Sequence, residues 1–143
     1  MDTARFAKCL VKTTASHLAR LKENYEKNVN AFNDLGGILP DWLFPGNTRY
    51  HQHMLYGTPV EFRYDDVVLD WKSQTVIGLQ LLVSFSIQDV EIFFFISTLD
   101  SPDCIKEKIW RAIRHKKMMA ERFVDDASKL CDEFLADIPE EDC

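Results

Sequence analysis

The spacing of apolar residues predicts a long amphipathic helix over residues 3–33. The stripe positions recur every three or four residues, which is the period of one helix face. They are Phe6, Leu10, Thr14, Leu18, Leu21, Tyr25, Val29 and Phe32. Gly36 and Gly37 follow. Glycine most readily adopts the left-handed conformation of a helix C-cap, so we expect the helix to end just before this pair.

Apolar and polar residues then alternate, which predicts strands. We expect four antiparallel strands within residues 49–97, joined by short turns. Gln88-Asp89 is a candidate two-residue hairpin turn before the last strand. Asp65-Asp66 interrupts the alternation of the second strand, so a bulge is expected there.

The last predicted strand, residues 90–97, is apolar on both of its faces. Phe93 and Phe95 lie on the face opposite to that of Ile92 and Ile96. A strand that is apolar on both sides is typical of sheets that are covered on both faces. We therefore expect a helix or a second subunit on the far face, and a homodimer is the expected assembly.

A second helix is predicted from Ser101-Pro102-Asp103, since serine caps a helix, proline suits its first turn and aspartate favours its positive end. Helical spacing continues to about residue 136, and residues 137–143 are expected to be a frayed acidic tail. The predicted fold class is α+β in one domain, residues 1–143. It has a long N-terminal helix, a four-stranded antiparallel meander and a long C-terminal helix, with the helices packed mainly on one face of the sheet.

Composition and charge narrow the function classes. The formal net charge of −6 and the pI of about 5.2 argue against a protein that binds nucleic acid over its whole surface. The apolar stretch 76–99 contains Asp89 and Glu91, which argues against a membrane span. The four widely spaced cysteines and the missing signal peptide favour reduced thiols and a cytoplasmic location.

The loop at residues 38–48 is unusually apolar. It is expected to fold over the core as a hydrophobic flap, because exposed apolar clusters are uncommon on monomers. The alternative is a partner-binding patch that presents Trp42 and Phe44.

No phosphate-binding loop, nucleophile elbow or paired Cys-x-x-Cys occurs, so we expect no enzyme activity and no cofactor. His51 and His53 are two residues apart, so their side chains lie on the same face of the predicted strand, as a metal site would require. The candidate third ligands are Asp65, Asp66 and Asp70. Two ligands without a defined third do not specify a site, so no metal is predicted and both histidines are expected to be solvated on an edge strand.

His17 lies beside the apolar stripe of the first helix, and Cys9 is also near it. Eight helical residues separate the two by about 12 Å, which is too far for a catalytic pair. Both are therefore expected to be boundary residues between the core and the surface.

A basic segment at residues 106–117 is the best candidate for nucleic-acid contact. Seven Lys/Arg face three Asp/Glu in residues 101–122. Basic side chains with an interleaved aromatic suit phosphate contact and base stacking. The candidate residues are Lys108, Trp110, Arg111, Arg114 and Lys117.

An acidic end follows, where residues 123–143 carry one Lys/Arg and eight Asp/Glu. The candidate partner-binding carboxylates are Asp125, Asp126, Asp132 and Glu133. The preferred hypothesis is a small acidic binding protein, of inhibitor, immunity or adaptor type, that docks on a basic protein. The alternative is a nucleic-acid-associated protein that uses residues 106–117. A second alternative is a small enzyme or ligand binder with a pocket between sheet and helices, around Trp42, His51 and Trp71.

Overall fold

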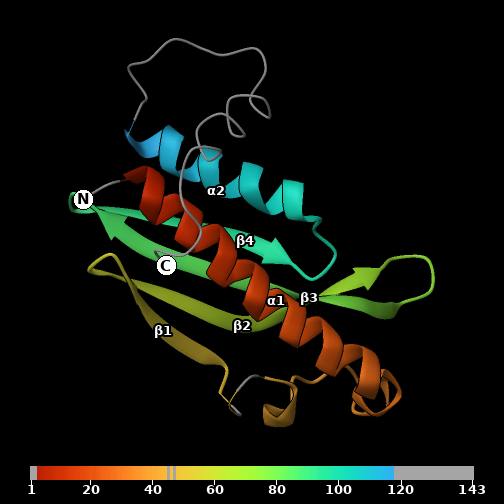
Figure 1. Cartoon of the computed structure of the whole chain (residues 1–143). Coiled ribbons are helices and arrows are strands. Elements are labelled where there is room, and N and C mark those ends of the chain that lie inside the picture. Colours follow the sequence, from red (N-terminus) through yellow and green to blue (C-terminus); the bar gives the residue numbers. More distant parts are fainter. Residues whose placement is uncertain (1–2, 45, 47, 118–143) are drawn as a thin grey trace.

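The computed structural model describes residues 3–44, 46 and 48–117. These residues form two layers, an antiparallel sheet and two helices that cover one of its faces (Figure 1). The elements are α1 (Thr3–Asp34), the 3-10 helix η1 (Asp41–Leu43), β1 (Tyr50–Leu55), β2 (Thr58–Asp70), β3 (Thr75–Ile87), β4 (Val90–Ser97) and α2 (Pro102–Lys117). The α+β class and the order of its elements are thus confirmed.

The sheet is a meander in which the strands lie in the order β1-β2-β3-β4, all antiparallel. The predicted hairpin turn is present, because Gln88 and Asp89 both have the positive φ that a tight turn of this kind requires. The predicted bulge is also present, as a register shift between Tyr64 and Asp66. Both irregularities fall where polar residues interrupt the alternation of the sequence.

Local chemistry sets the ends of the helices as predicted. Beyond α1, Gly37 has a φ of +75° and its N–H donates to the carbonyl of Phe32, so glycine ends the helix. At the start of α2, the Ser101 hydroxyl accepts the N–H of Cys104 at 3.2 Å. The expected continuation of α2 to residue 136 lies outside the described residues and stays a prediction.

The core lies between the sheet and the helices. α1 crosses the sheet and contacts β1, β3 and α2, while α2 packs beside β4 (Figure 1). The predicted stripe of α1 is buried except for Val29, which is half-buried. The inward residues of the central strands are also buried; among them are Val60, Phe62, Tyr64, Leu79, Leu81, Val83 and Phe85.

The apolar loop between α1 and β1 is only partly a flap. Leu39, Leu43 and Phe44 are buried, and the Leu43 carbonyl accepts a hydrogen bond from Asn24 of α1 at 3.0 Å. Trp42 is 41% exposed. The buried side chains of the loop therefore close this end of the core, while the indole of Trp42 lies at the surface.

The cysteines correct one expectation. Cys104 is a free thiol and half-buried, as predicted. Cys9 is buried but disulfide-bonded, so the prediction of reduced thiols is wrong for this residue. The cytoplasmic location stays a prediction.

Thr14 offers a test of the core. Its side chain is fully buried in the stripe of α1, and its hydroxyl has no hydrogen-bond partner among the described residues. A buried unsatisfied polar group costs about 1–3 kcal/mol.

Thr14→Val keeps the shape and removes the hydroxyl, so it should raise the free energy of unfolding by about 1 kcal/mol in urea titrations. Thr13→Val, at the half-buried neighbouring position, is the control. A loss of stability in Thr14→Val would mean that the hydroxyl is bonded in solution.

Candidate functional site

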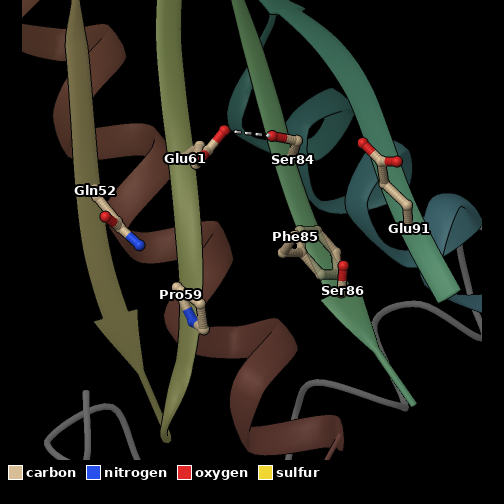
Figure 2. A pocket seen from close by; sticks show the side chains of 7 residues that line it. All are labelled: Gln52, Pro59, Glu61, Ser84, Phe85, Ser86 and Glu91. Atoms are coloured by element: carbon tan, nitrogen blue, oxygen red, sulfur yellow. Dashed lines mark hydrogen bonds between the residues drawn. The ribbon is translucent and has the colours of Figure 1, made fainter. Parts of the chain in front are cut away.

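The face of the sheet opposite the helices, here called the outer face, carries no described helix. Figure 2 looks onto it, with the helices behind the strands and polar side chains from all four strands in front. Strand pairing arranges the side chains in rows. One row is Gln52, Glu61, Ser84 and Phe93, and the next is Tyr50, Arg63, Leu82 and Phe95.

Hydrogen bonds hold the polar half of the outer face in place. The Glu61 carboxylate accepts the Tyr50 hydroxyl at 2.8 Å and lies 3.5 Å from the Ser84 hydroxyl (Figure 2). The bond to Glu61 raises the pKa of Tyr50, because it stabilises the protonated phenol. The Arg63 guanidinium lies 5.9 Å from the centre of the Tyr50 ring. These contacts fix the side chains of β1 and β2 before any partner arrives.

The other half of the outer face is apolar and open. Phe93 is 60% exposed and Phe95 is 47% exposed. Two hollows lie on this face, with volumes of about 220 and 380 Å³, and Glu61, Ser84 and Glu91 line both of them. The prediction that β4 is apolar on both faces is confirmed. No helix covers its second face within the described residues, and the homodimer stays a prediction.

The basic segment is largely engaged within the molecule. Trp110 is buried in the core, and the Arg114 guanidinium lies over its ring at 4.9 Å. Lys108 pairs with Asp100 at 2.9 Å, and Arg111 pairs with Glu107 at 2.6 Å. An indole in the core is not exposed for base stacking, so this geometry does not favour the nucleic-acid hypothesis.

Several predicted site residues fall outside the described part of the chain. They are the carboxylates Asp125, Asp126, Asp132 and Glu133, and the side chain of Lys117. Their role stays a prediction. In the loop, Trp42 lies partly at the surface whereas Phe44 is buried, so the two do not form one exposed patch.

A second cluster of functional groups lies on the helix side of β1. His51 and His53 share the inward face of this edge strand, as the alternation predicted. They are half-buried rather than solvated, because His17 of α1 packs against both of them. The ring centres of His17 and His51 are 5.2 Å apart, and those of His17 and His53 are 4.9 Å apart. The expectation of two solvated histidines is therefore wrong.

Hydrogen bonds join His17 to its neighbours in a chain. Tyr64 lies 2.5 Å from Nδ1 of His17, and Nε2 of His17 lies 2.8 Å from Nε2 of His53. Burial raises the pKa of Tyr64, so this phenol keeps its proton and can donate it to Nδ1. In that arrangement His17 carries its own proton on Nε2 and donates it to His53. The hydrogen-bonded chain thereby couples the tautomers of the two imidazoles.

The same surroundings hold His17 neutral. Burial, and then the neighbouring charges of His53, His51 and Arg20, lower its pKa to about 4. Burial and His51 also lower the pKa of His53. The surroundings of His17 and His53 thus disfavour a positive charge on either imidazole.

The aspartates proposed as further ligands lie elsewhere. Asp66 accepts the N–H of Val67, and Asp70 accepts the hydroxyl of Ser73 in the β2–β3 turn. Among residues 3–44, 46 and 48–117, no group of three or more His, Cys, Asp or Glu side chains is arranged to hold a metal ion.

Sequence reasoning missed the importance of His17, although a signal was present. His17 lies three residues after Thr14 and four before Leu21, so helical period places it on the same buried face. What the sequence did not contain was the pairing of that face with β1. Trp71, grouped with His51 in one hypothesis, is 80% exposed in the β2–β3 turn. It lies about nine strand residues, or roughly 30 Å, beyond the partner of His51 on β2.

Comparison with protein-family models, with curated proteins and with solved structures finds no match for this chain. Neither described helix is both long enough and apolar enough to cross a lipid bilayer.

Proposed function

We propose that this chain is a small acidic binding protein that docks on a basic protein partner through the outer face of its sheet. The observation that carries the proposal is the pair Phe93 and Phe95, exposed side by side on a strand whose other face is in the core. Exposed aromatic side chains in a cluster are a typical mark of a protein interface.

The construction of the outer face supports a protein rather than a small ligand as the occupant. Its hollows, of about 220 and 380 Å³, lie on a sheet face where Phe93 and Phe95 are exposed, and a protein surface is large enough to cover such a face as a whole. The fixed Tyr50–Glu61 pair adds a polar rim beside the aromatic residues. An apolar centre with a polar rim is the usual anatomy of a recognition surface.

Charge supports a basic partner. Glu61 and Glu91 line one hollow together with Phe93, where Arg63 is the one basic residue of the described lining, and the chain as a whole has a net charge of −6. A partner with lysine or arginine around an apolar centre would match both features. An inhibitor, immunity or adaptor role is the kind of function that fits a small binding protein, and the acidic end at residues 123–143 would add attraction at long range.

The proposal is tested by photo-crosslinking from position 93. A benzoylphenylalanine in place of Phe93 keeps an aromatic ring there, and the same residue in place of the exposed Trp71 is the matched control. We expect a basic protein to be crosslinked from position 93 and not from position 71. With that partner purified, Phe93→Ser should weaken binding about 30-fold or more, the loss expected of a buried aromatic anchor. Glu91→Lys should slow association at low salt, because it removes attraction at the rim.

Other results would replace the proposal. Crosslinking only to a second copy of this chain, with a dimer in light scattering, would make the outer face a homodimer interface. Crosslinking to nucleic acid from the same position would favour the alternative hypothesis. Equal crosslinking from positions 93 and 71, with no effect of Phe93→Ser, would refute a docking role for the outer face.

A further inference from the structure

A pocket between α1 and β1 is lined by basic and neutral side chains. It has a volume of about 450 Å³, and its polar lining comes from Lys12, Ser16, His17, Arg20, His51 and His53 together with a threonine. None of the lining side chains is a carboxylate, although Asp and Glu outnumber Lys and Arg in the chain by 23 to 17. The described walls of this pocket are therefore basic, although the chain as a whole is acidic.

We propose that this pocket binds a small phosphate-bearing ligand, such as inorganic phosphate or a phosphomonoester. The occupant is anionic because the guanidinium of Arg20, the ammonium of Lys12 and three imidazoles surround one space. Phosphate suits these groups better than carboxylate does. It offers oxygens in more than two directions, and the donors come from two elements that face each other.

The arrangement of the donors supports this assignment. Lys12, Ser16 and Arg20 are spaced by four residues, so they lie along one face of α1 and form one wall of the pocket. His51 and His53 alternate along β1 and form the other wall. The volume is large enough for a phosphate and a small organic group attached to it.

The hydrogen-bonded chain gives the pocket a proton-dependent response. When His17 donates to His53, a proton added to His53 would place two N–H groups against each other. That conflict is relieved when the proton of His17 moves from Nε2 to Nδ1, which donates to the Tyr64 oxygen, and Nε2 becomes an acceptor. The pair can therefore take up one further proton, and an anion in the pocket supplies the charge that stabilises it.

Among the described residues, four charged or titratable groups face the pair of His17 and His53. Lys12 and Arg20 come from α1, His51 from β1 and Tyr64 from β2. Each of these groups either disfavours the protonation of His53 or has no effect on it. Anion binding should therefore be accompanied by proton uptake at His53. For an anion whose own charge is constant, binding should strengthen as the pH falls from 7.5 to 6.

The probe is inorganic phosphate, titrated into the full chain at pH 6.0 and 7.5 at fixed ionic strength. Nitrogen-detected NMR of the imidazole rings reports on the site directly. We expect saturable shifts of the His17 and His53 rings at both pH values. Chloride at equal ionic strength should leave these rings unmoved. Sulfate is a dianion at both pH values and should bind severalfold more tightly at pH 6.0.

Variants distinguish the pocket from general attraction. Arg20→Met removes an exposed charge from one wall and should weaken phosphate binding tenfold or more. Arg63→Met removes an exposed charge from the outer face and should have no effect. His53→Gln should leave sulfate binding that no longer depends on pH in this range. Partner binding through Phe93 should be unchanged in Arg20→Met, which separates this site from the outer face.

Three results would overturn the assignment. The first is the absence of saturable ring shifts at both pH values. The second is an equal loss of binding in Arg20→Met and Arg63→Met, which would mean only diffuse attraction. The third is a response of the rings to Zn²⁺ and none to phosphate, which would make the cluster a metal site.

Discussion

Phe62→Ala should lower the free energy of unfolding by about 3–5 kcal/mol, whereas Phe93→Ala should lower it by less than about 1 kcal/mol. The two residues have the same chemistry and lie on opposite faces of one sheet. Phe62 is fully buried beneath α1, and its ring stacks on His17 with centres 4.5 Å apart. Phe93 is mostly exposed on the outer face. Removing the Phe62 ring leaves a cavity in the core, whereas solvent fills the space that the Phe93 ring occupied.

Urea titration monitored by circular dichroism measures both variants. A loss of 3–5 kcal/mol is a large part of the stability of a domain of this size, so Phe62→Ala should be partly unfolded under mild conditions. Phe62→Leu keeps most of the buried volume and should be intermediate. Equal losses from Phe62→Ala and Phe93→Ala would contradict the assignment of the inner and outer faces, and with it the proposed docking surface.

The elements of the fold were predictable because each depends on local chemistry. The period of α1, the Gly36-Gly37 stop, the Gln88-Asp89 turn and the Ser101 cap each follow from a few neighbouring residues. The face of each strand also followed from its alternation, so the exposure of Phe93 is a consequence of the sequence pattern.

The candidate sites were harder to predict because they depend on contacts between distant elements. Nothing near His17 in the sequence indicates that it will meet His53, which is 36 residues away, or Tyr64, which is 47 residues away. Trp110 shows the opposite case. Its basic neighbours favoured an exposed helix face, but helical period and the packing of α2 beside β4 place the indole in the core. Tertiary packing, and not local pattern, decides these positions.

Stability should fall as the pH is lowered from 6.5 toward 4, because His17 is buried as a neutral imidazole. Its pKa is about 4 in the folded chain, against an ordinary value of about 6.5 when unfolded. Above pH 6.5 neither state binds the proton, and the full stability is present. Between pH 6.5 and 4 only the unfolded state binds it, so stability is lost as the pH falls. Below pH 4 both states bind it and this loss is complete. The slope stays below about 1.4 kcal/mol per pH unit for this group, reduced by water that reaches the pocket.

His17→Gln tests this expectation, since glutamine is polar but does not titrate. Urea midpoints between pH 5 and 7, above the range where most carboxylates titrate, should fall less steeply with acid in His17→Gln than in the unmodified chain. Phosphate in the buffer should also flatten the slope of the unmodified chain, because an anion in the pocket stabilises the protonated imidazoles. Acetate at the same ionic strength is the control. Identical slopes in both proteins would show that the pKa of His17 is the same in the folded and the unfolded state. The hydrogen bonds that join Tyr64, His17 and His53 would then not affect the pH dependence of the stability.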